Sequence, residues 1–209
     1  NKFSVGIVTN GTLLNDNIIS ELKRMNIDVV QLSLESIIPE EHDLIRGKGN
    51  YKVVMDKINK LIKANIPVGL TITLNKINIH QLREYLAWAR DSGIYGVRIG
   101  VLHRWGRAIE MSEEIAPSNQ YEEYKLLYRA YEISKEFSNS LSITLERFPV
   151  NTIPNGCMAL VSFAITPQEE IVPCDIFAQT DMVITHLSKI SDLYQMWDDP
   201  KYKKIREHF

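Results

Sequence analysis

The segment Val29–Ser36, with the sequence VVQLSLES, decides the fold class of this chain. It begins as a β-branched apolar run, typical of a buried strand, and ends in the polar residues Ser33 and Glu35. Because side chains alternate between the two faces of a strand, these two polar side chains are expected to point to the same side. The same succession, an apolar strand that runs into polar residues, occurs at three other places in the chain.

The three other strands are expected at residues 4–8, 68–74 and 96–102. They run into Thr9-Asn10-Gly11, Asn75 and His103-Arg104-Trp105-Gly106, respectively. Apolar residues at helical spacing follow the four strands, at 15–25, 51–64, 80–92 and 119–137, and a last strand is expected at 142–146. Alternating strands and helices indicate a parallel sheet with its working groups at the carboxyl ends of the strands. The predicted fold class is α/β, a partial TIM-type (β/α) barrel that contains the later units only.

Composition narrows the class of partner and the location. A net charge of -2 over 209 residues gives no reason to expect a nucleic-acid partner, because proteins that bind nucleic acids usually carry an excess of basic residues. No apolar run approaches the roughly 18 residues that a membrane-spanning helix needs, and the start lacks a signal-peptide pattern. With only two cysteines, Cys157 and Cys174, a disulfide framework is not expected and a cytoplasmic location is preferred.

A boundary is expected after the (β/α) units, where residues 148–156 contain two prolines and a glycine. It divides the chain into residues 1–147, the barrel units, and residues 148–209, a smaller region. In the smaller region, two short strands around the turn Pro167–Glu170 predict a hairpin that brings Cys157 and Cys174 near each other. Helices are expected to follow at 190–197 and 201–209.

Several of these segments together resemble radical S-adenosylmethionine (SAM) enzymes. Ser33–Ser36 is similar to the Ser-Leu-Asp-Gly strand end of that family, and residues 42–51 resemble its His-Asp and Arg-Gly-x-Gly segment. Residues 156–174 resemble the opening of a SPASM domain, the C-terminal extension of many members. The chain departs from the family at Glu35, where aspartate is usual, and at Leu160, where glycine is usual. It also lacks the C-x3-C-x2-C motif that binds the SAM cluster in the family.

The resemblance implies a set of site residues and cofactors. The implied cofactors are SAM and [4Fe–4S] clusters, expected in the intact parent protein. Arg46, a planar donor suited to a carboxylate, would contact the carboxylate that SAM carries. The implied SAM-binding residues are Thr9, Asn10, Ser33, Glu35, Arg46, Asn75 and Leu102. His103, Arg104 and Trp105 are the implied substrate contacts, and Cys157 and Cys174 are implied ligands of an auxiliary cluster in the parent protein only.

The implied activity is that of an oxidoreductase that cleaves SAM to a 5′-deoxyadenosyl radical and modifies a peptide or protein. Ribosomal-peptide or sulfatase maturation is the preferred substrate class. The implied partners are that substrate and a reductant protein such as flavodoxin or ferredoxin. Without the cysteine motif, these 209 residues alone are expected to be inactive. The edge strand at residues 4–8 is expected to promote self-association.

Plainer interpretations stay open for each motif. Thr9-Asn10-Gly11 fits an ordinary tight turn, and Ser33 with Glu35 fits a polar strand end at the solvent. Residues 42–51 fit a solvated loop in which Asn50 caps the next helix, and the two cysteines fit buried, reduced thiols. Two other functions also stay open: an unrelated α/β-barrel lyase, although no strand ends in a lysine suited to a Schiff base, and a non-catalytic binding module.

Overall fold

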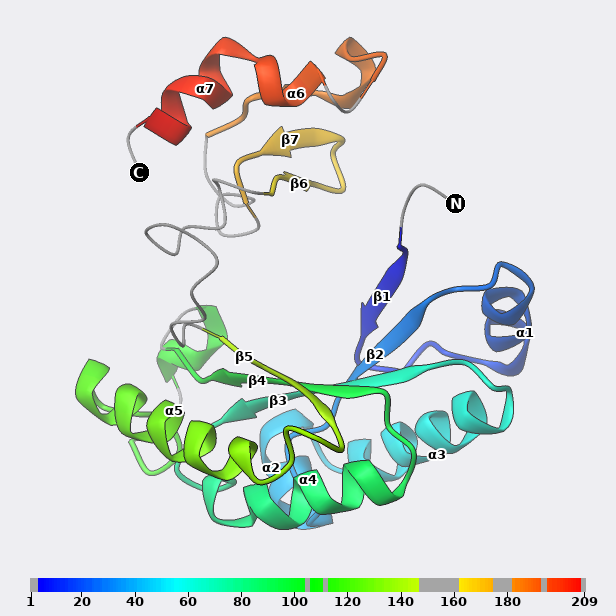
Figure 1. The fold of residues 1–209 in the computed structure, drawn as a ribbon, viewed down its shortest axis with the longest axis vertical. Helices are drawn as coiled ribbons and strands as arrows, with labels where there is room; N and C mark the ends of the chain where they lie inside the picture. Colours follow the sequence, from blue (N-terminus) through cyan, green and yellow to red (C-terminus); the bar gives the residue numbers. More distant parts are fainter. Residues whose placement is uncertain are drawn as a thin grey trace. The chain divides into compact units, whose positions relative to one another are not determined.

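The computed structural model describes residues 4–103, 106–110, 113–146, 162–174, 182–192 and 195–207. The chain forms two compact units, Asn1–Phe148 and Pro149–Phe209 (Figure 1). The first unit alternates strands and helices, and the second contains a small antiparallel sheet followed by short helices. Within the described ranges, no helix combines the length and the apolar character needed to cross a membrane.

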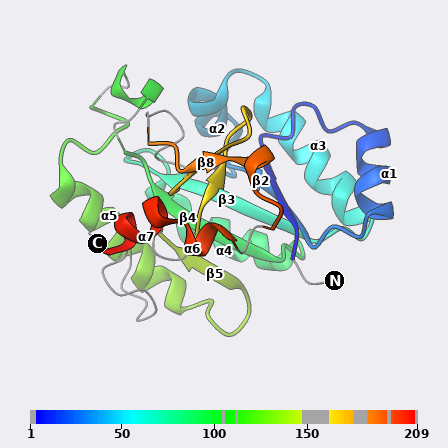
Figure 2. The same cartoon turned by 90° about the horizontal axis from the view of Figure 1, so that it is seen from above.

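The first unit is built on a five-stranded sheet. Its strands are β1 (Gly6–Thr9), β2 (Val29–Ser33), β3 (Val68–Leu74), β4 (Gly96–Val101) and β5 (Ser142–Leu145). They lie in the order β1-β2-β3-β4-β5, and every neighbouring pair is parallel. Figure 2 shows β2, β3, β4 and β5 side by side in this order. The parallel arrangement confirms the predicted α/β fold class.

Helices cover one side of this sheet. The helices of the first unit are α1 (Asp16–Arg24), α2 (Pro39–Arg46), α3 (Asn50–Lys63), α4 (Leu82–Asp91) and α5 (Gln120–Lys135), and the unit also contains the 3-10 turns η1 (Ile79–Gln81) and η2 (Gly106–Glu110). Figure 1 shows α2, α3, α4 and α5 on the same side of the sheet. Asn15 and Asn119 cap α1 and α5 by accepting hydrogen bonds from the backbone N–H groups of Ile18 and Glu122.

Helix α2 corrects one sequence-based interpretation. The segment before Asn50 fitted a solvated loop, whereas residues Pro39–Arg46 form two helical turns. Pro39 occupies the start of the helix, where its fixed backbone angle and missing N–H cost nothing. Asn50 is the first residue of α3 rather than its cap, and Gly49 takes the cap position with a φ of 81°.

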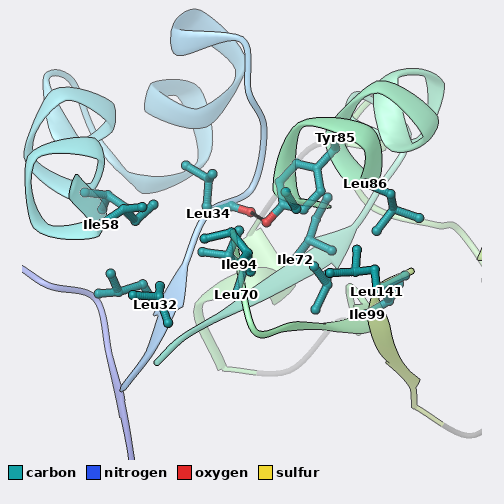
Figure 3. Close-up of a cluster of buried hydrophobic side chains, with 14 of the residues drawn as sticks. Leu32, Leu34, Ile58, Leu70, Ile72, Tyr85, Leu86, Ile94, Ile99 and Leu141 are labelled. Atoms are coloured by element: carbon teal, nitrogen blue, oxygen red, sulfur yellow. Dashed lines mark hydrogen bonds between the residues drawn. The ribbon is translucent and has the colours of Figure 1, made fainter. Parts of the chain in front are cut away.

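Alternate strand residues form the core beneath the helices. The side chains of Leu32, Leu34, Leu70 and Ile72 are fully buried there, and Figure 3 shows them packed together with Tyr85 and Leu86 of α4. Burial of each large apolar side chain stabilises a fold by about 1.5–3 kcal/mol. Because the core residues occupy every second strand position, the opposite face of the sheet is left to the residues between them.

Strand β2 leaves the sheet just after Leu34. The Leu34 N–H still donates to the Thr71 carbonyl, at 3.0 Å. Its carbonyl accepts a hydrogen bond from the Tyr85 hydroxyl instead, also at 3.0 Å (Figure 3). Burial, and to a smaller extent the Glu35 carboxylate, raise the pKa of Tyr85 well above its usual range, so the hydroxyl remains a donor. Helix α4 is thereby joined to the end of β2.

The second unit is a small sheet with its own core. Its strands are β6 (Ala164–Ile165), β7 (Glu170–Val172) and β8 (Thr185–His186), antiparallel in the order β6-β7-β8. A 3-10 turn, η6 (Leu187–Lys189), and the helices α6 (Gln195–Asp198) and α7 (Pro200–Glu207) follow. Its fully or nearly fully buried core residues are Ile171, Ile184, Met196 and Tyr202. The predicted hairpin is confirmed, and α7 corresponds to the helix predicted at 201–209. The helix predicted at 190–197 is shorter in the structure, because residues 190–192 are not helical and α6 spans only Gln195–Asp198.

Of the two cysteines, only Cys174 lies within the described residues. Its thiol is free and buried, just after β7. Cys157 lies outside the described residues, and the predicted approach of the two cysteines stays a prediction.

The Tyr85 hydroxyl offers a test of how β2 is held. Tyr85→Phe leaves the fully buried Leu34 carbonyl without its hydrogen bond, and we expect the free energy of unfolding to fall by about 1–3 kcal/mol. Urea denaturation measures this loss. Tyr128→Phe is the matched control, because Tyr128 is 50% exposed. Equal losses in the two variants would contradict the assigned role of the Tyr85 hydroxyl.

Candidate functional site

A buried carboxylate lies at the carboxyl end of β2. The Glu35 side chain is fully buried, and its Oε1 atom accepts hydrogen bonds from Nε of Arg46, at 2.8 Å, and from Nη2 of the same guanidinium. Its Oε2 atom accepts the backbone N–H of Thr73 at 2.7 Å. Both carboxylate oxygens are therefore engaged, as the high cost of burying an unpaired charge requires.

Backbone hydrogen bonds fix Glu35 from two further directions. Its N–H donates to Nδ1 of the buried His42 at 3.0 Å, and its carbonyl accepts from Nδ2 of Asn78 at 2.8 Å. Since Nδ1 of His42 acts as an acceptor, the ring proton is on Nε2, which donates to Oδ1 of Asn50 at 2.9 Å. The His42 side chain consequently connects β2, α2 and the start of α3.

The connection from α2 to α3 is closed by Asp43. Its carboxylate accepts the N–H groups of Gly49, at 2.5 Å, and Tyr51, at 2.7 Å. These hydrogen bonds, first that from Tyr51 and then that from Gly49, lower the pKa of Asp43. Gly47 and Gly49 have φ values of 103° and 81°, which other residues adopt only with strain. Arg46 is therefore at the end of a helix that is followed by a well-defined turn.

Asn75 forms a local turn after β3. Its Oδ1 accepts the N–H groups of Ile77 and Asn78, at 2.9 and 3.2 Å, and its Nδ2 donates to the Thr73 carbonyl at 3.1 Å. In turn, the N–H of Asn75 donates to Oδ1 of Asn78 at 2.9 Å. Since Asn75 is only 1% exposed, its amide is used mainly to shape the end of β3. Its predicted contact with SAM stays a prediction.

The face of the sheet opposite the core is polar, and Ser33 lies on it. Ser33 is aligned with Thr71, Thr71 with Arg98, and Arg98 with Thr144. We call this the polar face, with the members Gln31, Ser33, Thr71, Thr73, Arg98, Thr144 and Glu146. Gln31 donates to the Thr71 hydroxyl at 2.7 Å. Ser33 is partly exposed, and its hydroxyl makes no hydrogen bond within the part of the chain that the structure describes.

An ion pair lies further along the polar face. Arg98 and Glu146 are 2.7 Å apart, with 52% and 35% of their side-chain surfaces exposed. Gly100 leaves the room for the Glu146 carboxylate, because an added Cβ there would come within 2.4 Å of it. Neither charged residue stood out in the sequence. The isolated arginine at the centre of the apolar run 96–101 was the signal that could have identified Arg98.

The first predicted turn lies at the end of β1. The Thr9 hydroxyl accepts the Gly11 N–H at 3.1 Å, and Oδ1 of Asn10 accepts from the N–H and hydroxyl groups of Thr12, at 3.1 and 2.8 Å. Thr9 is aligned with Leu32, so its side chain is on the helix-covered side of the sheet, opposite to that of Ser33. A SAM contact in this turn stays a prediction. Asn10 and the backbone N–H groups of the turn are better candidates for it than the Thr9 side chain.

The predicted substrate contacts follow β4. The N–H of Leu102 donates to the Leu74 carbonyl at 2.9 Å and so extends the β3–β4 ladder. Nδ1 of His103 lies 3.1 Å from the Glu123 carboxylate of α5, in a half-buried pair. Arg104 and Trp105 lie outside the described residues. The structure therefore brings Leu102 and His103 to the same edge of the sheet as Asn75.

Part of this edge of the sheet lies in a stretch that matches a known protein family. The profile of the radical SAM superfamily matches residues 1–89, which include β1, β2 and β3 and the site around Glu35. Residues 1–89 of this chain belong to the radical SAM superfamily.

Several known proteins resemble this chain over longer stretches. The AdoMet-dependent heme synthase of Methanosarcina barkeri is 30% identical over 141 residues, which are 67% of this chain and 39% of that protein. The sporulation killing factor maturation protein SkfB of Bacillus subtilis is 32% identical over 108 residues, 51% of this chain and 26% of SkfB. The crystal structure of Streptococcus suis SuiB bound to S-adenosylmethionine matches with a TM-score of 0.75 and 14% identity, over 98% of this chain and 50% of SuiB. The chain thus spans half or less of the length of these proteins.

The radical SAM match of residues 1–89 implies SAM and a [4Fe–4S] cluster, and the residues of this chain fit the two cofactors differently. Clusters of this kind are held by several cysteine thiolates, and the 209 residues contain two cysteines. Among the described residues, no three His, Cys, Asp or Glu side chains converge to hold a metal. For SAM, the Ser33 hydroxyl and the outer edge of the Arg46 guanidinium provide unengaged donors at one strand end. The chain therefore fits SAM and does not fit the cluster.

Asp43 gives this site a pH dependence. Because its folded-state pKa is lowered, the stability that it contributes is present above the unfolded pKa of about 3.9 and is lost as the pH falls through the lower folded value. Asp43→Asn places amide hydrogens against a backbone N–H, so we expect it to be less stable than wild type at neutral pH. The difference in unfolding free energy should shrink below about pH 4.

Urea denaturation of both proteins across this pH range provides the measurement. Glu40→Gln, an exposed carboxylate of the same helix, is the control and should show no comparable loss. A stability difference for Asp43→Asn that persists unchanged at acid pH would contradict the role of the Asp43 charge.

Proposed function

We propose that this protein is a radical SAM oxidoreductase that modifies a peptide or protein. One observation carries the proposal: the superfamily match covers the strand end at which Ser33 and Arg46 keep unengaged donors. SAM, together with the cluster that the superfamily uses, would supply the radical chemistry. The chain's own residues bind and orient SAM and shape the surface on which the substrate lies.

Arg46 and Ser33 are the proposed SAM contacts. One third of the Arg46 side chain is exposed, and the terminal nitrogen Nη1 remains after Nε and Nη2 have bound Glu35. A guanidinium edge is a strong donor for a carboxylate, which SAM carries on its methionine part. Ser33 lies two residues before Glu35, on the same face of the strand, and its hydroxyl adds a neutral donor. Leu102, at the end of β4, is the proposed apolar neighbour of the adenine.

The proposed substrate is a peptide or protein of the kind handled by maturation enzymes. The relative SkfB is named for the maturation of a sporulation killing factor, and SuiB, whose fold this chain shares, has been crystallised with its precursor peptide SuiA. The polar face offers the ion pair of Arg98 and Glu146 together with threonine hydroxyls. Donors and acceptors of this kind suit the amide groups of a peptide, and His103 adds a polar group at the same sheet edge.

A second candidate is the modification of a tetrapyrrole. The match at 30% identity with AdoMet-dependent heme synthase is longer than the match with SkfB. The two substrate classes share the radical chemistry and differ in what lies against the polar face. A product assay with both substrate classes distinguishes them.

The remaining features of the proposal concern partners. A reductant protein such as flavodoxin or ferredoxin would supply the electron, and the location would be cytoplasmic. Self-association through the edge strand also stays a prediction: Val5 and Val8 are 53% and 69% exposed, and within the described residues β1 pairs only with β2. We expect light scattering of these 209 residues at high concentration to detect dimers or larger species. A clean monomer would contradict this.

The proposed function is tested by SAM cleavage in the complete gene product. After anaerobic reconstitution with iron and sulfide, we expect dithionite to drive formation of methionine and 5′-deoxyadenosine, measured by liquid chromatography. Arg46→Gln should raise the SAM concentration needed for half-maximal rate by about tenfold or more, because a charge-assisted hydrogen bond is lost. Lys48→Gln, which removes an exposed cation in the same turn, is the control and should behave like wild type.

The outcomes separate the candidate functions. A protein that binds iron but forms no 5′-deoxyadenosine would favour a non-catalytic module. A protein that cleaves SAM and modifies a porphyrin precursor but no peptide would replace the proposed substrate class with the second one. Equal effects of Arg46→Gln and Lys48→Gln would remove Arg46 from the SAM site.

A further inference from the structure

We propose that Glu35 is a positioning residue: it does not touch SAM, but orients Arg46 so that one edge of its guanidinium faces the SAM carboxylate. The inference rests on the proposed function, because it takes SAM as the ligand of Arg46. It replaces the direct contact between Glu35 and SAM that the family resemblance implied.

The bonding of Glu35 argues against a direct contact. Its side chain has no exposed surface, Oε1 is occupied by Arg46, and Oε2 is occupied by the Thr73 N–H. A ligand that approached this carboxylate would have to displace a buried ion pair or a backbone hydrogen bond of β3. Arg46 is different, because a third of its side chain reaches the surface. The exposed partner of the pair is therefore the one that can bind a ligand.

The pattern of nitrogens used by Arg46 gives the orientation. Glu35 takes Nε and Nη2, which together form one edge of the planar guanidinium. With that edge fixed, the direction of the remaining nitrogen Nη1 is fixed as well, because the group is rigid and planar. Fixing the donor before the ligand arrives removes part of the entropy cost of binding.

The surroundings of Glu35 hold it more firmly than a stability role requires. His42 and Asn78 bind its backbone N–H and carbonyl, and Thr73 binds its side chain, so three elements fix this one residue. Buried ion pairs contribute little net stability compared with apolar side chains of similar volume. A buried carboxylate paired with a part-exposed arginine is therefore better explained by orientation of the arginine than by stability of the fold.

The test compares two ligands that differ only in the carboxylate. Binding of S-adenosylmethionine and of decarboxylated S-adenosylmethionine to the complete gene product is measured by calorimetry. Glu35→Gln keeps the volume and an acceptor for the Thr73 N–H, but removes the charge that orients Arg46. We expect it to weaken S-adenosylmethionine about tenfold and the decarboxylated ligand less than twofold, since only the former has a group for Arg46.

A mutant cycle with Arg46→Gln supplies the control. In the Arg46→Gln background, Glu35→Gln should cause no further loss of S-adenosylmethionine affinity, because its effect acts through Arg46. If Glu35→Gln does not fold, Glu35→Asp keeps the charge on a shorter side chain and should weaken S-adenosylmethionine with the same selectivity. Urea denaturation of each variant checks that it is folded.

Each outcome bears on a different claim. An equal loss for both ligands would overturn the inference, because it would mean general damage to the site. An additive loss in the mutant cycle would also overturn it, since Glu35 would then act independently of Arg46. A wild-type protein that binds neither ligand would overturn the proposed function, and this inference with it.

Discussion

The carboxylate of Glu35 joins three parts of the fold that would otherwise separate at the edge of the sheet. After Leu34, strand β2 no longer pairs with β3 through its backbone, because the Leu34 carbonyl binds the Tyr85 hydroxyl. Glu35 then takes the free Thr73 N–H with one oxygen and Arg46 of α2 with the other. A buried charge is stable only with such partners, so the position of α2 depends on this residue.

The two faces of the sheet differ in chemical character: one is apolar and packs against the helices, and the other is polar. The helix-covered face has a continuous apolar core, in which Leu32, Leu70 and Ile72 are fully buried. The polar face retains side chains that can meet a ligand, among them Ser33 and the pair of Arg98 and Glu146. The strand ends lie at one edge of these two faces, where a parallel sheet brings together groups that are far apart in the sequence.

Periodic signals were read correctly from the sequence, and long-range polar contacts were not. The four strand–helix units and the hairpin of the second unit were predicted from apolar spacing and turn residues, and the structure contains them. Helix α2 was missed because its eight residues are mostly polar and its apolar face is short. Arg46 was identified as a carboxylate binder, but its pairing with Glu35, eleven residues away, depends on how α2 folds back.

The sequence by itself determined the alternation of strands and helices and the polar character of the strand ends. It also predicted a boundary near residue 148. Local periodicity and turn chemistry carry that information within a few residues of each position. Only the tertiary structure decided which polar groups remain available. The side chains of Glu35 and Asn75 are engaged in internal hydrogen bonds, whereas Ser33 and part of Arg46 are exposed. Arg98 forms an ion pair with Glu146. These outcomes depend on which buried groups meet across the sheet, and no local pattern specifies that.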